Sequence, residues 1–209
     1  MVYRSPLIDK LPKGFPFTVS EASRLGVPKA SLYRFRDLGV IDQLGPGLYF
    51  LSQSLDADLD LLEAAYKAPL ATICLSSALA RHGLIDEIPS TIDLALPRGK
   101  TPPKIAGTIT WHQFDKATFD LDRTLVPIEG VEDARIGIYS AERSIVDAFR
   151  LRASAGYETG IEALRNWLKR PGSQPARLME LSTAIPRSKG PLRVAMEVLL
   201  SDSSSRPGR

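Results

Sequence analysis

The chain has 209 residues, a length that fits one large domain or two small ones. It is 44% hydrophobic and 24% charged, which is ordinary for a globular protein and argues against a disordered or collagen-like chain. A single cysteine excludes an internal disulfide framework, and no apolar run approaches the ~20 residues that cross a bilayer. The first residues also lack the apolar core of a signal peptide, so we expect a cytoplasmic protein with no membrane partner.

The formal net charge of +3 is unevenly distributed along the sequence. Residues 1–50 carry a net charge of +3, residues 51–160 carry −5, and residues 161–209 carry +5. Two basic ends around an acidic middle favour a polyanion as the partner of the basic ends. Ordinary solvated helix faces are the alternative explanation of these charges.

The first fifty residues predict short helices followed by a hairpin. Residues 18–21, Thr-Val-Ser-Glu, form a capping-box pattern that starts one helix, and Gly26 is suited to end it. Pro28 fits the first position of a second helix over residues 29–38, which ends at Gly39. Two helices joined by a short turn containing glycine indicate a helix-turn-helix.

Two short strands, residues 40–44 and 48–51, are predicted on either side of a Gly-Pro-Gly turn and complete a winged helix. On the second helix, Leu32, Phe35 and Leu38 share an apolar face that we expect to pack inward. The other face can contact DNA in the major groove. The candidate DNA-binding residues are Lys13, Arg24, Lys29, Ser31, Tyr33, Arg34 and Arg36. A winged helix that docks a protein, or one that has lost its function, is the alternative.

The rest of the chain predicts a mixed α/β domain with a helical C-terminal half, so the fold class is α+β. We place the winged-helix domain at residues 1–55, the second domain at 56–201 and a flexible tail at 202–209. The pattern predicts helices at 59–67, 77–82, 140–151, 157–168, 176–184 and 191–200, and strands at 72–75, 91–96, 107–112 and 136–139.

Familiar catalytic motifs are missing from the sequence: there is no Walker A loop, no G-x-S-x-G and no H-E-x-x-H. Cys74 and the two histidines match no ligand spacing, so we expect no metal site, a buried thiol and capping or surface histidines. The basic loop 97–104 could bind an anion, although an exposed solvated loop is the favoured explanation. Arg143 and Asp147 lie one helical turn apart, and an exposed pair of this kind contributes only ~0.2–0.5 kcal/mol, so we expect a structural role.

Three segments, in their order along the chain, resemble the motifs of one protein family. The first runs through Leu32-Tyr33-Arg34, Leu38-Gly39-Val40-Ile41 and Leu44-Gly45-Pro46-Gly47-Leu48-Tyr49. The second, residues 75–84, is similar to a Ser-x-x-Ala-Leu-x-x-His-Gly-Leu motif, and the third, residues 138–147, to (Ser/Thr)-x-Glu-Arg-Thr-(hydrophobic)₂-Asp, with Ser144 in place of the threonine. Together they resemble the AbiEi family of antitoxins from bacterial toxin–antitoxin pairs. The hallmark positions are Gly45, Gly47, Tyr49, Ser76, His82, Gly83, Glu142, Arg143 and Asp147.

The resemblance implies a cytoplasmic antitoxin whose winged helix binds operator DNA upstream of its own gene and represses its operon. It also implies that the C-terminal domain counters a nucleotidyltransferase-like toxin, with or without a stable complex. Sequestration of the toxin, competition for its RNA target and covalent modification of the toxin are all open. We expect no cofactor for this function.

Two other functions fit the same residues. An enzymatic antitoxin, an atypical serine/threonine phosphotransferase, would use ATP and magnesium to phosphorylate a hydroxyl on the toxin. Its candidate catalytic residues are Asp93, Arg98, Lys100, Arg143 and Asp147, although the missing glycine loop counts against it. A transcription regulator whose second domain binds a small ligand is the other alternative, and no residue pattern selects the ligand.

Overall fold

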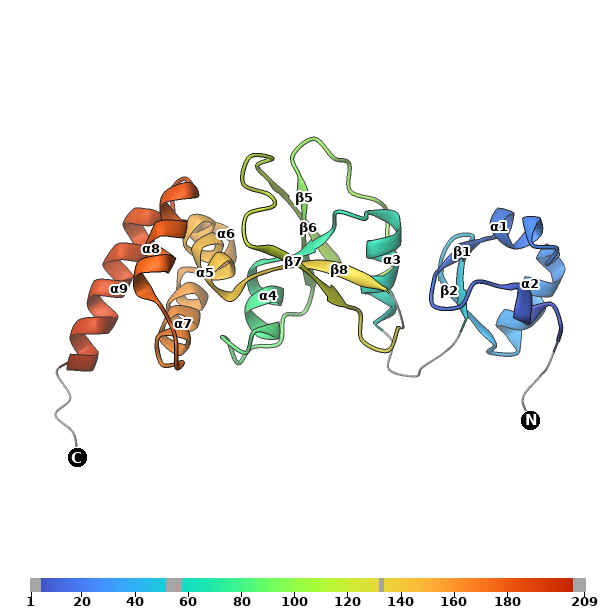
Figure 1. The fold of residues 1–209 in the computed structure, drawn as a ribbon, viewed down its shortest axis with the longest axis horizontal. Helices are drawn as coiled ribbons and strands as arrows, with labels where there is room; N and C mark the ends of the chain where they lie inside the picture. The colour runs from blue at the N-terminus through green and yellow to red at the C-terminus, as the bar shows by residue number, and fades with distance from the viewer. Residues whose placement is uncertain (1–4, 52–57, 132–133, 205–209) are drawn as a thin grey trace, which may run out of the picture. The chain divides into compact units, whose positions relative to one another are not determined.

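The computed structural model describes residues 5–51, 58–131 and 134–204. It contains helices and two β-sheets, which confirms the α+β fold class (Figure 1). Backbone contacts group the chain into two compact units. The first unit contains 1–71, 101–109 and 125–136, and the second contains 72–100, 110–124 and 137–209. The domain boundary predicted at residue 55 lies outside the described residues, so it stays a prediction.

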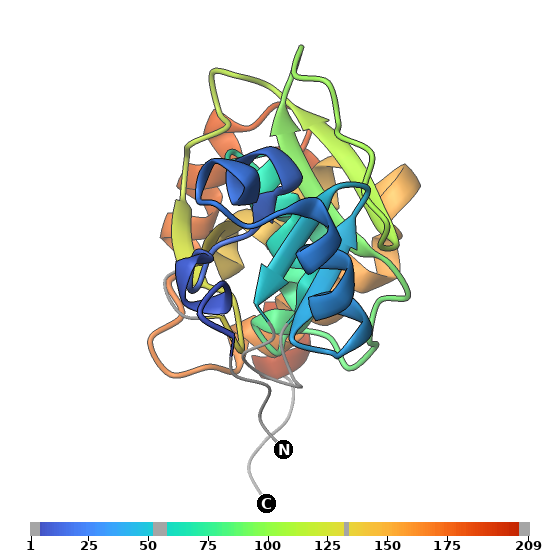
Figure 2. The same cartoon turned by 90° about the vertical axis from the view of Figure 1, so that its right-hand side faces the viewer.

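The N-terminal region is a winged helix, seen from its end in Figure 2. Its elements are η1 (Ile8–Lys10), β1 (Phe17–Thr18), α1 (Val19–Arg24), α2 (Lys29–Asp37), β2 (Ile41–Gly45) and β3 (Leu48–Leu51). The strands form an antiparallel sheet in the order β1-β3-β2. Strand β1 was not predicted, because it has only two residues and runs directly into the capping box.

Local hydrogen bonds fix the ends of the two helices. The Oγ1 of Thr18 accepts a hydrogen bond from the Glu21 amide at 3.2 Å, and Glu21 Oε2 accepts one from the Thr18 amide at 2.7 Å, so the capping box is confirmed. Gly26 and Gly39 follow α1 and α2 with φ of +80° and +67°, a conformation that favours glycine. The prediction for Pro28 was wrong by one residue, because it is the N-cap of α2 and has an extended backbone.

A small apolar core lies beneath α2. Leu32 and Phe35 are buried in it, as predicted, but Leu38 is 50% exposed. Leu38 caps the C-terminus of α2, where the chain turns away at Gly39, so the helical periodicity no longer applies to it. The core is completed by Leu11, Phe17, Ala22, Val27, Ile41, Tyr49 and Leu51.

The second sheet has the strand order β6-β5-β4-β8-β7. Strand β4 pairs antiparallel with β5 and parallel with β8, so the sheet is mixed. Its strands and the two nearby helices are α3 (Leu59–Lys67), β4 (Thr72–Ile73), α4 (Leu75–Arg81), β5 (Ile92–Pro97), β6 (Ile109–Phe114), β7 (Arg123–Pro127) and β8 (Arg135–Tyr139). Strand β7 was not predicted, since its residues are mostly exposed or half-buried and show no apolar pattern.

The C-terminal half is helical, as predicted. It contains α5 (Ala141–Arg150), α6 (Arg152–Ala155), α7 (Tyr157–Leu168), α8 (Pro175–Ala184) and α9 (Lys189–Ser204). Helix α5 packs against α4, α7, α8 and α9 around an apolar core (Figure 1). Helix α9 continues to Ser204, and the flexible tail predicted at residues 202–209 stays a prediction. Residues 205–209 lie outside the described residues.

The ion pair between Arg143 and Asp147 is buried, which corrects the expectation of a weak exposed pair. Arg143 Nε lies 2.7 Å from Asp147 Oδ2, and both side chains are 0% exposed. Arg143 Nη1 also donates hydrogen bonds to the carbonyls of Thr118 and Leu121, at 2.6 and 2.9 Å. A second cation, Arg150, lies 2.9 Å from the other carboxylate oxygen. The structural role that we expect for this pair is therefore that of a buried ion pair.

We expect Asp147→Ala to lower the free energy of unfolding by about 3–5 kcal/mol, because it leaves the Arg143 guanidinium buried without its counter-ion. The matched control is Glu197→Ala, which breaks another i,i+4 ion pair. The side chains of that pair, Arg193 and Glu197, are 63% and 64% exposed. That change should cost less than about 1 kcal/mol. Urea unfolding followed by circular dichroism measures both, and similar losses in the two variants would contradict the prediction.

Candidate nucleic-acid interface

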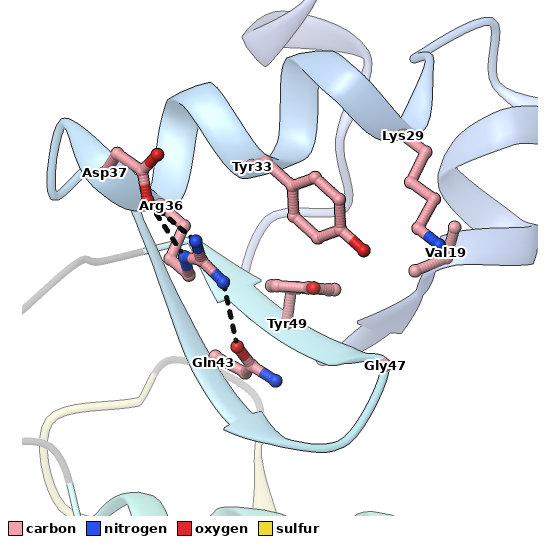
Figure 3. Close-up of a pocket in the computed structure, with 8 residues that line it drawn as sticks. All are labelled: Val19, Lys29, Tyr33, Arg36, Asp37, Gln43, Gly47 and Tyr49. Atoms are coloured by element: carbon pink, nitrogen blue, oxygen red, sulfur yellow. Dashed lines mark hydrogen bonds and ion pairs between the residues drawn. The ribbon is translucent and has the colours of Figure 1, made fainter.

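Helix α2 exposes a cationic face beside its buried residues. Lys29, Tyr33 and Arg36 follow the i, i+4, i+7 spacing that places residues on one side of a helix. Figure 3 shows the three side chains projecting from α2 toward the β2–β3 hairpin. All three are exposed, and Tyr33 is 39% exposed.

A pocket of about 560 Å³ lies between α2 and the hairpin (Figure 3). Its lining residues are Val19, Lys29, Tyr33, Arg36, Asp37, Gln43, Gly47 and Tyr49. A recognition helix beside a wing is the arrangement in which a winged helix contacts DNA. The pocket therefore marks the surface of α2 that faces the wing.

Tyr33 holds the two cations of this face. The Lys29 ammonium lies 5.5 Å from the centre of the Tyr33 ring, and the Arg36 guanidinium lies 5.3 Å from it. Both distances are within the ~6 Å at which a cation is attracted to an aromatic face. Two positive groups that would otherwise repel each other are thus kept on one helix face.

Arg36 has two further partners, one on each side of the pocket. Its Nη2 lies 2.8 Å from Asp37 Oδ1, and its Nη1 donates a 3.5 Å hydrogen bond to Gln43 Oε1 on β2. The hydrogen bond to Asp37 raises the pKa of Arg36 above its ordinary value. The side chains of Arg36 and Asp37 are 41% and 65% exposed, and ion pairs this exposed are weak. A phosphate or base edge can therefore replace Asp37 at little cost.

The structure brings together three of the seven predicted DNA-binding residues. Lys29, Tyr33 and Arg36 line the pocket, whereas Ser31 and Arg34 lie on α2 outside its lining. Lys13 and Arg24 are exposed on the surface and do not line it either.

Sequence reasoning missed Gln43 as a member of this surface. The available signal was its place in β2, where the polar Gln43 lies between the buried Ile41 and Leu44.

The hallmark residues of the wing shape the hairpin. Gly47 has a φ of +74° in the turn, and the strand register shifts between Gln43 and Gly45. Tyr49 is buried and its ring stacks on Phe17, with 6.4 Å between ring centres. These residues position the wing next to α2.

The hallmark residues of the second unit make structural contacts. His82 ends α4, and its Nε2 donates a 2.7 Å hydrogen bond to the Tyr139 carbonyl. Gly83 follows with a φ of +61°. Glu142 accepts a 3.2 Å hydrogen bond from the Trp167 indole. Ser76, at the start of α4, lines a different pocket.

The five candidate catalytic residues do not line one common pocket. Arg143 and Asp147 are buried against each other, whereas Arg98 is 70% exposed and lies 3.9 Å from Asp115. Lys100 follows β5 on the exposed loop, and Asp93 pairs with His112 on the neighbouring strand. Within residues 5–51, 58–131 and 134–204, no group of three or more His, Cys, Asp or Glu side chains is placed to hold a metal ion. Over the same ranges, every helix is too short or too polar to cross a membrane.

Residues 10–52 match a protein family described as "Transcriptional regulator, AbiEi antitoxin". The N-terminal region is therefore similar to the AbiEi antitoxin family. The match covers the elements from β1 to β3, including the cationic face of α2 and the wing. It confirms the family resemblance for the first of the three segments found in the sequence. A comparison with curated proteins finds no match to the chain.

We expect Thr18→Ala to lower the free energy of unfolding by about 1 kcal/mol, because it removes the N-cap of α1. The backbone and side-chain hydrogen bonds from Thr18 hold the pKa of Glu21 below its ordinary value. A lowered carboxyl pKa stabilises the fold above the unfolded-state pKa, and that stabilisation is lost as the pH falls through the folded-state pKa.

The difference between Thr18→Ala and the natural chain should therefore be largest near neutral pH and smaller at about pH 3, below the ordinary glutamate value of about 4.3. Thermal unfolding across this pH range provides the measurement. Ser20→Ala, an exposed change inside the same helix, is the control and should alter stability little. A loss in Thr18→Ala that stays constant down to pH 3 would argue against the contribution of Glu21.

Proposed function

We propose that this protein is the antitoxin of a bacterial toxin–antitoxin pair and represses its own operon by binding operator DNA. The cationic face of α2 is the observation that carries the proposal. Lys29 and Arg36 are held around Tyr33 on an exposed helix face, within the segment that matches the AbiEi regulator family. Exposed cations beside a wing are the groups that bind phosphates and base edges.

In this proposal α2 enters the major groove and the wing lies along the DNA backbone. Arg36 exchanges its exposed contact with Asp37 for a phosphate oxygen or a guanine edge, the partners that arginine forks match best. Lys29, at the N-terminal end of α2, adds a second positive charge. Its ring contact with Tyr33 orders the side chain before binding, which lowers the entropy lost on binding.

The second part of the proposal is that the protein counters a nucleotidyltransferase-like toxin. It rests on the antitoxin description of the matched family and on the likeness of residues 75–84 and 138–147 to the family's motifs. The five candidate catalytic residues lie in different surroundings, which supports neutralisation without phosphotransfer by those groups. No cofactor is required for this function.

Binding to the DNA upstream of the gene, compared with shuffled DNA, tests the regulatory part of the proposal. We expect Arg34→Ala and Arg36→Ala each to weaken binding by about 1–3 kcal/mol, the usual worth of a base-edge contact. Arg165→Ala, an exposed arginine in the second unit, is the matched control and should bind like the natural chain. Fluorescence anisotropy at two salt concentrations measures these affinities. Unchanged affinity in both α2 variants would remove α2 as the reading helix.

Asp37→Asn tests the exchange at Arg36 separately. The change removes the carboxylate that pairs with Arg36 and also a negative charge beside the DNA backbone. We therefore expect tighter operator binding, by a few-fold, with the gain largest at low salt because the added attraction is electrostatic. Asp120→Asn, which removes an exposed carboxylate in the second unit, controls for net charge. Weaker binding by Asp37→Asn would mean that Arg36 needs Asp37 in the complex.

The enzymatic alternative makes its own prediction. Incubation of the purified toxin with this protein, ATP and magnesium would add the mass of a phosphate to the toxin if the protein is a phosphotransferase. We expect the intact mass of the toxin to stay unchanged. An added phosphate would replace the non-enzymatic proposal.

A further inference from the structure

The second unit contains a pocket that is separate from the winged helix. It has a volume of about 410 Å³, and residues from β5, β6, the start of α4, the loop after α4 and α7 line it. The lining side chains that carry the argument are Ser76, Glu87, Thr91, Asp93, Thr110 and His112. A volume of this size is in the range of small-molecule sites.

Two side-chain pairs on neighbouring strands build one wall of this pocket. His112 Nε2 lies 2.8 Å from Asp93 Oδ1, and Thr110 Oγ1 donates a 3.1 Å hydrogen bond to Thr91 Oγ1. Thr91 directly precedes β5, two residues before Asp93, and Thr110 lies two residues before His112 on β6. Side chains two residues apart in an extended chain lie on the same side, and all four residues line the pocket. They are therefore held by the sheet in a fixed arrangement.

Helix α4 anchors this wall from behind. The Asp93 amide donates a 2.8 Å hydrogen bond to Ser77 Oγ, and that hydroxyl donates one of 3.3 Å to the Thr91 carbonyl. The backbone from Thr91 to Asp93 is thus tied to the helix that carries Ser76. The side chains of Asp93 and His112 are 14% and 22% exposed, so both are largely shielded from water and still reach the pocket.

The polar side chains that line the pocket can act as hydrogen-bond acceptors. Asp93 Oδ1 accepts a hydrogen bond from His112 Nε2. Asp93 Oδ2 and the Glu87 carboxylate add two more acceptors, and the hydroxyls of Ser76 and Thr110 can accept as well. None of the lining residues, all within the described chain, is a lysine or an arginine. The pocket therefore favours a ligand that carries positive charge and several N–H donors.

We infer that this pocket binds a small organic cation, an alkyl amine or alkyl guanidinium with a short aliphatic body. The charged end would contact Asp93 and Glu87, because a carboxylate hydrogen bond to a cation is stronger than a neutral one. The aliphatic part would pack on the apolar lining residues Leu75, Ile85 and Pro89. A phosphate or carboxylate ligand would meet the carboxylates of Asp93 and Glu87 and no lysine or arginine, so anions are disfavoured. This inference is independent of operator binding.

Calorimetry with agmatine and with spermidine, on the full-length protein, tests the inference. We expect saturable binding of at least one of the two at one site. The neutral 1,4-butanediol and the anion glutarate should not bind, because neither brings a positive charge to the carboxylates. Saturable binding of neither cation, or binding of glutarate, would overturn the inference.

Proton NMR of the two histidines locates the ligand. The ring of His112 lines the pocket, whereas the ring of His82 is bonded to the Tyr139 carbonyl and is not part of the lining. Titration of the cation that binds should shift the His112 ring signal and leave the His82 signal in place. A shift of the His82 signal alone would place the ligand elsewhere and contradict the assignment.

Variants separate this site from general charge attraction. Asp93→Asn should weaken binding by about tenfold or more, since it removes a charged acceptor. Asp120→Asn makes the same change in charge on an exposed residue outside the pocket, and should leave the affinity unchanged. Equal effects of the two variants would overturn the site.

A second variant keeps the test decisive if Asp93→Asn unfolds. Thr110 is exposed at the edge of the pocket, so Thr110→Lys places a positive charge there with little disturbance of the core. This variant should abolish binding by repelling the cation. Thr124→Lys, an exposed strand position outside the lining, is the control. Undiminished binding by a folded Thr110→Lys protein would contradict the inference.

Discussion

The buried guanidinium of Arg143 is the contact on which the second unit depends. It donates hydrogen bonds to Asp147 on its own helix and to the carbonyls of Thr118 and Leu121 in the segment between β6 and β7. Its plane also lies 4.4 Å from the centre of the Tyr139 ring on β8. Because the guanidinium is flat and presents its donors in fixed directions, it can satisfy these partners together. A lysine ammonium at this place could not reach them all.

Tyr139 connects the buried arginine to other parts of the second unit. Its hydroxyl donates a 2.8 Å hydrogen bond to the Phe119 carbonyl, and its own carbonyl accepts the hydrogen bond from His82. His82 is the C-cap of α4, and Ser77 near the other end of α4 holds the backbone at Asp93. A continuous set of contacts therefore runs from the buried arginine to the wall of the pocket. The hallmark histidine and arginine share this network although 61 positions separate them in the sequence.

Structural features that depend only on neighbouring residues could be predicted from the sequence. The capping box at Thr18, the glycines that end α1, α2 and α4, and the extent of α7 all follow from neighbouring residues. The burial of Asp147 could not be predicted, because it depends on carbonyls that lie more than 20 residues away from Arg143. The same holds for the contact between Asp93 and His112, which joins strands separated in sequence by a long connection. Strands β1 and β7 were missed because tertiary pairing, and not their own composition, makes them strands.

Three aspartates show how burial sets the use of one side chain. Asp37 is 65% exposed, so its contact with Arg36 is weak and a phosphate can displace it. Asp147 is 0% exposed and lies between two arginines, where losing the carboxylate would leave the Arg143 guanidinium unpaired in the interior. Asp93 is intermediate: at 14% exposure it holds His112 with one oxygen and lines the pocket. Cationic residues on α2 suit a polyanion, and the acceptors around Asp93 suit a cation. In the two proposals, the basic N-terminal segment and the acidic middle of the sequence would bind ligands of opposite charge.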